Sequence, residues 1–295
     1  MTPESGPAAP ATGTAWGLAH AAAQRSGVRL VELESLDDMV ELERLTEAVW
    51  GTPEAPRHLA RALQHAGGVL LAARGPDGGV VGAALGFVGT RGGAHLHSHL
   101  AGVLPSWQGR GIGRALKLGQ RAACLGQGLT EMRWTYDPLL VRNAWFNLVS
   151  LGAVGTAFLW DFYGAMPDRQ NDGDRGDRFE VRWDLRAPVG ARPAGDADAT
   201  PLLRPVGDAT APWPEPVDAE PGAAASVAVP PGYPTLRRDD PALAARWRDA
   251  AAAAFARCFA AGLVAVSISR DGVYRFIPPV AAADAAPAAA GPPGR

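Results

Sequence analysis

The chain has 295 residues, of which 47% are apolar and 20% are charged, and this composition is typical of a globular protein with one large domain or two small ones. Its 28 basic and 30 acidic side chains nearly cancel, which argues against binding to nucleic acid or to an anionic membrane surface. The apolar stretches are shorter than the ~18 residues of a membrane span. No Lys or Arg precedes Arg25, so a signal peptide is not expected and we expect a cytoplasmic location.

The first 186 residues divide into a tail and one predicted domain. Residues 1–26 are rich in Ala, Gly, Pro and Thr with little periodicity, which predicts a disordered tail. Within residues 27–186, hydrophobic periodicity predicts strands and helices in the order β-α-α-β-β-β-α-β-α-β-β, over 28–34, 37–49, 57–66, 69–74, 80–90, 95–104, 114–125, 132–136, 142–151, 153–161 and 179–185. An antiparallel first half and a strand-helix-strand second half predict a mixed, mostly antiparallel sheet flanked by helices, the α+β class.

The C-terminal third has a different composition. Residues 187–234 are mostly Pro, Ala, Gly and Asp, which predicts a linker that is at most partly ordered. Residues 235–278 predict one helix and a β-hairpin, and residues 279–295 a second disordered tail. One helix and two strands cannot bury a core alone, so we expect this extension to dock on the first domain or on a second subunit in a homodimer.

The most specific segment is a glycine-rich turn over residues 103–116, between a predicted strand and a predicted helix. Glycines at 109, 111 and 113 allow close backbone approach, and the free amides of the helix start favour an anion such as a pyrophosphate. A dinucleotide-binding fingerprint is incomplete because Arg114 stands where its third glycine belongs, and a P-loop is absent. An ordinary glycine turn that opens a helix is the alternative interpretation.

Gln108, Gly111 and Gly113 fit the pattern Q/R-x-x-G-x-G/A after a strand, and this arrangement resembles the coenzyme A motif of the GNAT superfamily of N-acyltransferases. The order of elements from 28 to 185 resembles the whole GNAT domain. The series Trp-Thr-Tyr-Asp-Pro-Leu at 134–139 and the later Leu-Gly-Ala resemble a bacterial subfamily of small-molecule acyltransferases with a C-terminal extension. The resemblance implies a GNAT fold, acetyl-CoA or another acyl-CoA such as succinyl-CoA as cosubstrate, a small-molecule amine such as an amino acid as acceptor, and no metal.

The resemblance also implies the residues that bind coenzyme A. Backbone groups at the end of the strand would bind pantetheine, and the amides of the turn would bind pyrophosphate, with added charge from its two arginines. Asn143 would bond to the pantetheine arm or cap its own helix. The expected cofactor-binding residues are therefore Val103, Leu104, Gln108, Gly109, Arg110, Gly111, Ile112, Gly113, Arg114 and Asn143.

Catalysis by direct attack of the amine on the thioester needs a base and an acid. His97 lies six residues before Val103, where many GNAT enzymes carry a glutamate base, and no Asp or Glu occurs from 91 to 113. Strand alternation predicts that His97 and His99 share one face with residues 101 and 103. An imidazole with a pKa of ~6.5 suits removal of a proton from an ammonium. Leu148 occupies the position of the usual tyrosine acid, so either another acid, with Tyr163 and Tyr136 the nearby tyrosines, or solvent would protonate the sulfur.

Other functions are compatible with the same residues. His95, His97 and His99 form an H-x-H-x-H series that a zinc hydrolase could use, although no Asp adjoins it, and all three could simply be packed in the sheet. A non-enzymatic CoA sensor and a protein N-acetyltransferase are further alternatives. Cys124 and Cys258 match no zinc or redox spacing, which predicts core thiols in a reducing compartment rather than an acyl-cysteine.

Overall fold

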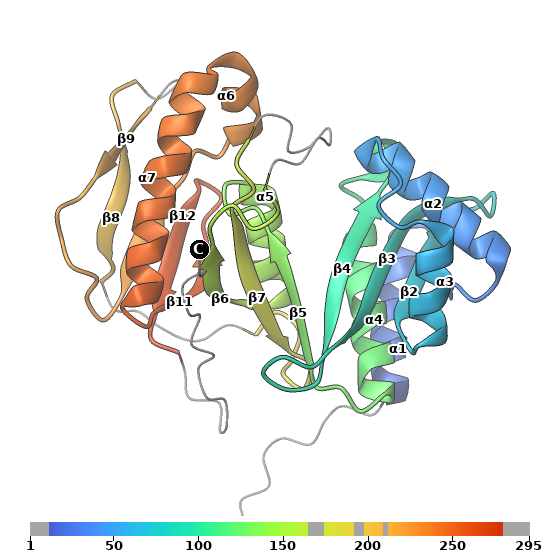
Figure 1. The fold of residues 1–295 in the computed structure, drawn as a ribbon. Helices are drawn as coiled ribbons and strands as arrows, with labels where there is room; N and C mark the ends of the chain where they lie inside the picture. Colours follow the sequence, from blue (N-terminus) through green and yellow to red (C-terminus); the bar gives the residue numbers. More distant parts are fainter. Residues whose placement is uncertain (1–11, 165–173, 192–197, 209–211, 280–295) are drawn as a thin grey trace, which may run out of the picture.

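The structure of the chain, a computed structural model, describes residues 12–164, 174–191, 198–208 and 212–279. Its described strands form one twelve-stranded sheet in the order β1-β2-β3-β4-β5-β7-β6-β11-β12-β10-β8-β9 (Figure 1). Neighbouring strands are antiparallel except for the pairs β4–β5 and β8–β10. The predicted α+β class with a mixed, mostly antiparallel sheet is therefore confirmed.

The first seven strands follow the predicted order. They are β1 (Arg29–Glu32), β2 (Val69–Arg74), β3 (Val80–Gly89), β4 (His95–Val103), β5 (Glu131–Tyr136), β6 (Val154–Leu159) and β7 (Arg178–Asp184). Between them lie α2 (Leu36–Trp50), α3 (Arg57–His65), the short 3₁₀ turn η1 (Pro105–Trp107), α4 (Ile112–Gly126), α5 (Val141–Ala144) and the π-helical segment η2 (Trp145–Leu151).

The helices cover both faces of the strands β1 to β4 and so create two cores. On one face, α4 buries residues such as Leu116 against Leu96 and Met132. On the other face, α2 and α3 bury a second cluster that includes Met39 and Leu100. Each residue of β4 therefore points either toward α4 or toward α2, and this assignment decides which side chains can meet at the site.

An N-terminal helix, α1 (Thr12–Arg25), replaces most of the predicted disordered tail. Its small side chains Ala15, Ala19, Ala22 and Ala23 are buried, and the helix packs along α4. The prediction of disorder for residues 1–26 is thus wrong for 12–25. The composition suggests low complexity, but the alanines recur at helical spacing and form a face that is buried. Residues 1–11 lie outside the described residues.

The predicted linker over 187–234 is also wrong, since three strands form there: β8 (Thr200–Val206), β9 (Trp213–Pro216) and β10 (Ala225–Ala228). The helix and hairpin expected over 235–278 are α7 (Pro241–Ala260), β11 (Val264–Ile268) and β12 (Val273–Ile277), preceded by a short helix α6 (Tyr233–Asp239). The extension docks on its own chain, because β11 pairs with β6. The predicted tail over 279–295 falls almost wholly outside the described residues.

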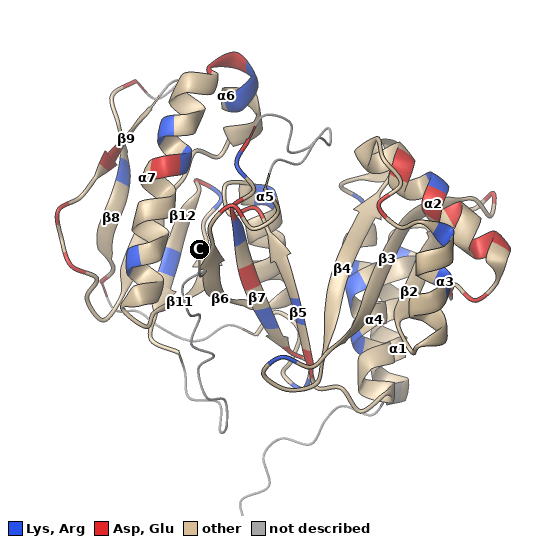
Figure 2. Cartoon of the chain, viewed as in Figure 1, with Lys and Arg blue, Asp and Glu red and all other residues tan. Residues whose placement is uncertain are grey.

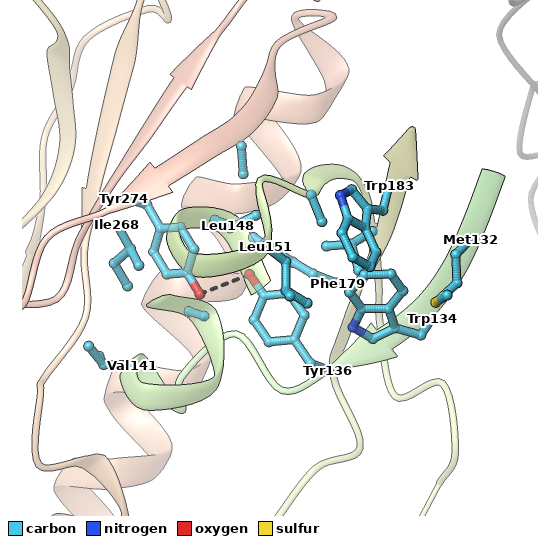
Figure 3. Close-up of a cluster of buried hydrophobic side chains, with 14 of the residues drawn as sticks. Met132, Trp134, Tyr136, Val141, Leu148, Leu151, Phe179, Trp183, Ile268 and Tyr274 are labelled. Atoms are coloured by element: carbon cyan, nitrogen blue, oxygen red, sulfur yellow. Dashed lines mark hydrogen bonds between the residues drawn. The ribbon is translucent and has the colours of Figure 1, made fainter. Parts of the chain in front are cut away.

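Aromatic side chains join the extension to the domain at this β6–β11 junction. Phe179 of β7 is fully buried, with ring centroids 4.6 Å from Phe255 and 5.2 Å from Phe259, both on α7. Figure 3 shows Phe179 beside Tyr136 and Leu151 and the hydrogen bond between the hydroxyls of Tyr136 and Tyr274. The extension therefore completes the core of the domain.

A buried ion pair links the same two parts. Arg248 of α7 donates to both carboxylate oxygens of Asp137, at 3.0 and 2.9 Å, and also to the carboxylate of Asp174. Asp137 follows β5 directly and accepts from the backbone amide of Leu139 at 2.9 Å. This pair fixes the segment that leads from β5 into α5.

Candidate active site

The strands β4 and β5 are paired at one end only and then diverge (Figure 1). Their parallel pairing consists of Leu96 with Met132 and His97 with Arg133. Ser98 and Trp134 stand at the next register level, where the two strands are no longer paired. Because β4 runs from the paired end to the open end, the turn that follows it and the start of α4 lie at the open end.

A β-bulge in β4 decides the direction of the candidate catalytic side chains. Leu85 of β3 pairs with Leu100, but its neighbour Gly86 pairs with Ser98, so His99 is the extra residue. His97 and His99 lie on the α2 side beside Phe87, with ring centroids 5.1 and 5.9 Å from the Phe87 ring.

Beyond the bulge, the alternation of β4 is shifted by one residue. Ala101 pairs with Ala84, which belongs to the core under α4, and Val103 packs on that same core. The prediction that His97 and His99 share a face with Ala101 and Val103 is therefore wrong. The two histidines still lie together, with ring centroids 6.3 Å apart.

The glycine-rich turn has the backbone conformation that its sequence requires. Gly109 and Gly111 have φ of +80° and +90°, and Gly111 is the N-cap residue of α4. In the part of the chain that the structure describes, the amides from Gly109 to Gly113 donate no hydrogen bond, whereas the Arg114 amide donates to the Gly111 carbonyl at 3.0 Å. Gln108 closes the turn by donating from Nε2 to the Val103 carbonyl at 3.1 Å. The turn thus presents free amides at the open end of the junction.

The two arginines of the turn differ. Arg110 is exposed, lies over the Trp107 ring at 4.6 Å and donates to the Ser106 carbonyl at 3.3 Å. Arg114 reaches across to η2, where it donates to the Ser150 carbonyl and to the Ser150 hydroxyl at 3.0 Å. Arg114 therefore ties α4 to η2, and Arg110 is the arginine that stands at the surface of the turn.

Asn143 and Asn147 lie in different surroundings. The helix α5 begins after Leu140, which makes no side-chain cap, so the prediction of Asn143 as a helix cap is wrong. Asn143 is exposed on the first turn of that helix. Asn147 is buried in η2 and accepts from Trp134 Nε1 at 3.2 Å, a contact that no sequence pattern indicated.

Both histidines of the α2 side are biased toward the neutral form. Burial, together with the neighbouring His99, His95 and Lys117 charges, lowers the pKa of His97 to about 4. Burial also lowers the pKa of His99, against the opposing effect of Glu54. A neutral imidazole accepts a proton, so both rings can act as bases at neutral pH.

His95 is separate from the other two. Its Nδ1 lies 2.8 Å from the Gly93 carbonyl, and the residue is buried at the start of β4. Among the described residues no group of three His, Cys, Asp or Glu side chains could hold a metal ion. The geometry gives the zinc-hydrolase alternative no support.

A family comparison decides the class of this site. Residues 36–138, which run from α2 through the turn to the end of β5, match the model of the acetyltransferase (GNAT) family. The chain contains a GNAT acetyltransferase domain. The strand order β1-β2-β3-β4-β5-β7-β6 is its GNAT fold, and the protein is an acyl-CoA-dependent acetyltransferase.

Solved structures of other GNAT enzymes show a partial likeness. The phosphinothricin acetyltransferase from Sinorhizobium meliloti in complex with AcCoA is 16% identical, with 58% of this chain and 95% of that chain covered and a TM-score of 0.46. The ribosomal-protein-S18-alanine N-acetyltransferase from Escherichia coli is 15% identical, with 57% and 97% covered and a TM-score of 0.45. No curated protein matches the chain in sequence at a significant level. Within the described residues, no helix has the length and apolar character needed to span a membrane.

The tyrosines near this GNAT site are placed differently from one another. Tyr136 is buried and lies 3.4 Å from the Tyr274 hydroxyl (Figure 3), and burial raises its pKa well above the usual value. Tyr163 is 40% exposed on the turn after β6, and its hydroxyl lies 3.2 Å from Thr135 Oγ1 of β5. Leu148 is fully buried in η2. Of the two tyrosines, Tyr163 alone has a hydroxyl near solvent.

A buried lysine on α4 completes the junction and was missed in the sequence. Lys117 Nζ donates to Ser98 Oγ at 2.7 Å and lies 3.9 Å from the centre of the Trp134 ring. Ser98 in turn donates to Gln120 Oε1 at 2.8 Å. A lysine within an amphipathic helix is usually a surface residue, so the sequence offers no signal for this position.

Proposed function

We propose that the protein is an N-acyltransferase that moves an acetyl group from acetyl-CoA to the amine of a small molecule by direct attack. The observation that carries the proposal is that the β4–β5 junction has an anion-binding turn and a pair of histidines at different positions. The free amides of the turn stand at its open end, while His97 in the last strand pair and His99 just beyond it lie on the α2 side of β4. A thioester held between the strands would meet an amine that approaches from the histidine side.

The coenzyme A site is built from backbone groups and Arg110. The pyrophosphate would lie on the amides from Gly109 to Gly113, at the positive end of the α4 dipole. The edge of β4 beyond His97 has no strand partner on the β5 side, and this edge can bind the pantetheine amides as a strand would. Asn143, exposed on α5, faces no competing partner in the described chain and would bond to the same arm.

The reaction then needs one proton removed before attack. An acceptor ammonium gives its proton to neutral His97, directly or through a water, with His99 beside it. The free amine attacks the thioester carbon, a C–N bond forms, and the C–S bond breaks with its electron pair on sulfur. The nitrogen releases its second proton to solvent as the amide forms. Cys124 and Cys258 are buried, and burial raises the pKa of each thiol to about 12, which argues against an acyl-cysteine intermediate.

Aromatic side chains after β6 support a small-molecule acceptor. Trp160, Phe162 and Tyr163 are exposed there, and Tyr163 contacts Thr135 on β5. Arg178 lies over the Tyr163 ring at 5.3 Å, where its charge favours an acceptor that carries a carboxylate, such as an amino acid. Asp137 does not hold the acceptor ammonium, because both of its carboxylate oxygens accept from Arg248.

The test is a turnover assay with purified full-length protein. Release of thiol from acetyl-CoA and from succinyl-CoA is measured against free amino acids, simple amines, and peptides with a free N-terminus or lysine. Turnover with a small amine supports the proposal, and the rates with acetyl-CoA and succinyl-CoA then identify the acyl donor. Turnover with peptides alone would make the enzyme a protein N-acetyltransferase. Calorimetric binding of CoA without any turnover would leave a CoA-binding protein.

A further inference from the structure

The α4 side of the β4–β5 junction carries a polar cluster that the proposed reaction has not used. It consists of Lys117, Ser98, Gln120 and the face of Trp134. Ser98 and Trp134 are the first residues at which β4 and β5 are no longer paired with each other, and the Lys117 amine contacts both. The amine therefore lies at the apex of the divergence, on the face from which α4 and η2 enclose the space between the strands.

This cluster has more hydrogen-bond donors than acceptors. Lys117 is 3% exposed, and within the described chain it forms no ion pair with a carboxylate. The helix α4 carries basic side chains and no acidic ones (Figure 2). An ammonium offers three N–H groups, of which Ser98 accepts one, and the fully buried Gln120 also leaves its Nε2 without a partner. The unmet donors favour an electron-rich atom at the apex.

The proposed reaction creates such an atom, because cleavage of the C–S bond leaves a thiolate. The position of the usual acid holds Leu148, which has no proton to give. The Tyr136 hydroxyl is hydrogen-bonded to the Tyr274 hydroxyl. Tyr163 contacts Thr135, which is next to Trp134 in β5 and therefore lies on the opposite face of the strand, away from α4. Tyr163 therefore lies on the opposite face of β5 from Lys117, and Tyr136, which shares the face of Trp134, has its buried hydroxyl engaged by Tyr274.

We propose that Lys117 is the general acid of this enzyme and protonates the departing thiolate of coenzyme A. The inference rests on the proposed function. As the C–S bond breaks, one N–H proton of the Lys117 ammonium passes to sulfur, which leaves free CoA thiol and a neutral Lys117 amine. The proton that His97 removed from the acceptor and the second proton that the acceptor nitrogen loses after attack both go to solvent, and Lys117 takes one proton from solvent before the next turnover. Ser98 positions the ammonium and does not itself transfer a proton.

The electrostatic surroundings allow this role near neutral pH. Burial lowers the pKa of Lys117 to about 7, and the Cys124 thiol on the same helix has a small opposing effect. From β4 the titratable neighbour is His97, on the opposite face, and from β5 the facing side chain is the uncharged Trp134. Arg25 of α1 acts on Arg114 instead. An acid must be protonated, so turnover should fall as pH rises through about 7.

The test compares pH profiles of kcat in four variants with that of the wild type. Lys117→Met should lower kcat by about 10² to 10⁴ and remove the fall at high pH. Lys117→Arg keeps the charge but not a titrating proton, and should remove the same fall. Ser98→Ala removes an acceptor of the ammonium, so the fall should move to lower pH. Arg121→Met, which removes another buried cation one turn along α4, is the matched control and should keep the wild-type profile.

Each result decides the proposal. Calorimetric binding of CoA checks that every variant keeps its cosubstrate site, and circular dichroism checks the fold. Should Lys117→Met fail to fold, the Lys117→Arg and Ser98→Ala profiles decide alone. A wild-type fall at high pH that persists in Lys117→Arg overturns the acid role and leaves the proposed function intact. A wild type that turns over no amine fails the proposed function itself.

Discussion

Two junctions in the twelve-stranded sheet are held by few residue pairs, and the side chains behind them differ in polarity. The β4–β5 junction has two residue pairs, and a buried lysine, a serine and a glutamine lie behind it. The β6–β11 junction has one pair, Gly155 with Ala265, and the rings of Phe179, Phe255 and Phe259 fill the space behind it. Weak pairing alone therefore does not make a site.

The difference between the two junctions concerns what replaces the missing strand hydrogen bonds. At β6–β11 apolar burial compensates, so the gap is part of the core. At β4–β5 the strand edges and the polar cluster behind them keep unsatisfied groups, and such groups are costly unless a ligand or water meets them. Substitutions at the first junction should change stability, and substitutions at the second should change binding and turnover.

The largest expected effect lies at the β4–β5 junction. His97→Gln should lower kcat by about 10² to 10⁴, because it removes the base. Because the His97 pKa is lowered to about 4, wild-type turnover should be lost as pH falls through about 4, and this acidic limb should disappear in the variant. His65→Gln, on the exposed face of α3, is the matched control. A His97→Gln enzyme with wild-type kcat and an unchanged acidic limb would place the base elsewhere.

Phe179→Ala tests the β6–β11 junction. Loss of a fully buried ring that contacts six other aromatic rings should lower the free energy of unfolding by about 3 to 5 kcal/mol, measured by urea denaturation. The kcat and KM of the molecules that remain folded should stay close to the wild type. Phe162→Ala, a ring that is half exposed, is the stability control and should change unfolding by less than about 1 kcal/mol. A larger effect on KM than on stability would contradict the division between the junctions.

Arg248→Met breaks the ion pair that secures the extension. It leaves Asp137 buried without its cation, while Asp174 keeps Arg237 at 3.4 Å, and the unpaired Asp137 should cost about 3 to 5 kcal/mol of unfolding free energy. Adding Asp137→Asn to that variant should recover part of the loss, since a neutral amide replaces the unpaired charge. If the single variant unfolds at the wild-type urea concentration, the extension is held by its aromatic side chains alone.

The same pair predicts how stability depends on pH. Burial alone would raise the pKa of Asp174, but hydrogen bonds from Arg248 and Tyr233 outweigh it and hold the pKa below its usual value. The unfolded chain therefore binds the proton more tightly, and the stability from this carboxylate is present above about pH 4 and lost as pH falls below it. Thermal unfolding between pH 6 and pH 3 should show this loss in the wild type and a smaller one in Arg248→Met.

The smallest effect is expected at the turn. Gly113→Val places a side chain among the amides of the α4 start, and its Cβ would meet only Phe146, at 3.9 Å, so the fold should persist. Loss of one bond to a charged phosphate, about 1.5 to 3 kcal/mol, should weaken CoA binding by about 10- to 100-fold. Gly17→Val, in open space on α1, is the helical control. Calorimetric titration of CoA measures both, and equal affinities would move the pyrophosphate away from this turn.

The sequence could predict those parts of the site that local geometry determines. Glycines at 109 and 111 are needed for a left-handed turn before a helix, and both have positive φ. The facing of His97 relative to Val103 could not be predicted, because the extra residue at His99 depends on register with β3. The buried position of Lys117 depends on which helix face meets Ser98 and Trp134, and this is a tertiary property.

The fold shows the same limit. Strands and helices with larger apolar residues follow their periodicity, whereas α1 and the strands β8 to β10 are rich in Ala or Pro. Composition predicts disorder for such segments, because each side chain buries little area. They are ordered here because α4 and β12 provide preformed surfaces on which small side chains pack closely.

The bond between Asp137 and Arg248 also has a consequence for synthesis on the ribosome. The two residues are 111 positions apart, so at about 5 to 20 residues per second the carboxylate waits roughly 5 to 20 seconds for its partner. During that time the nascent domain has an uncovered Phe179 and an unpaired charge ahead of α5. The domain that contains the candidate active site is therefore completed only when α7, from the last part of the chain to be synthesised, packs on it. Nascent chains stalled before α7 should be cut by protease within residues 137–159, and chains stalled after β12 should resist.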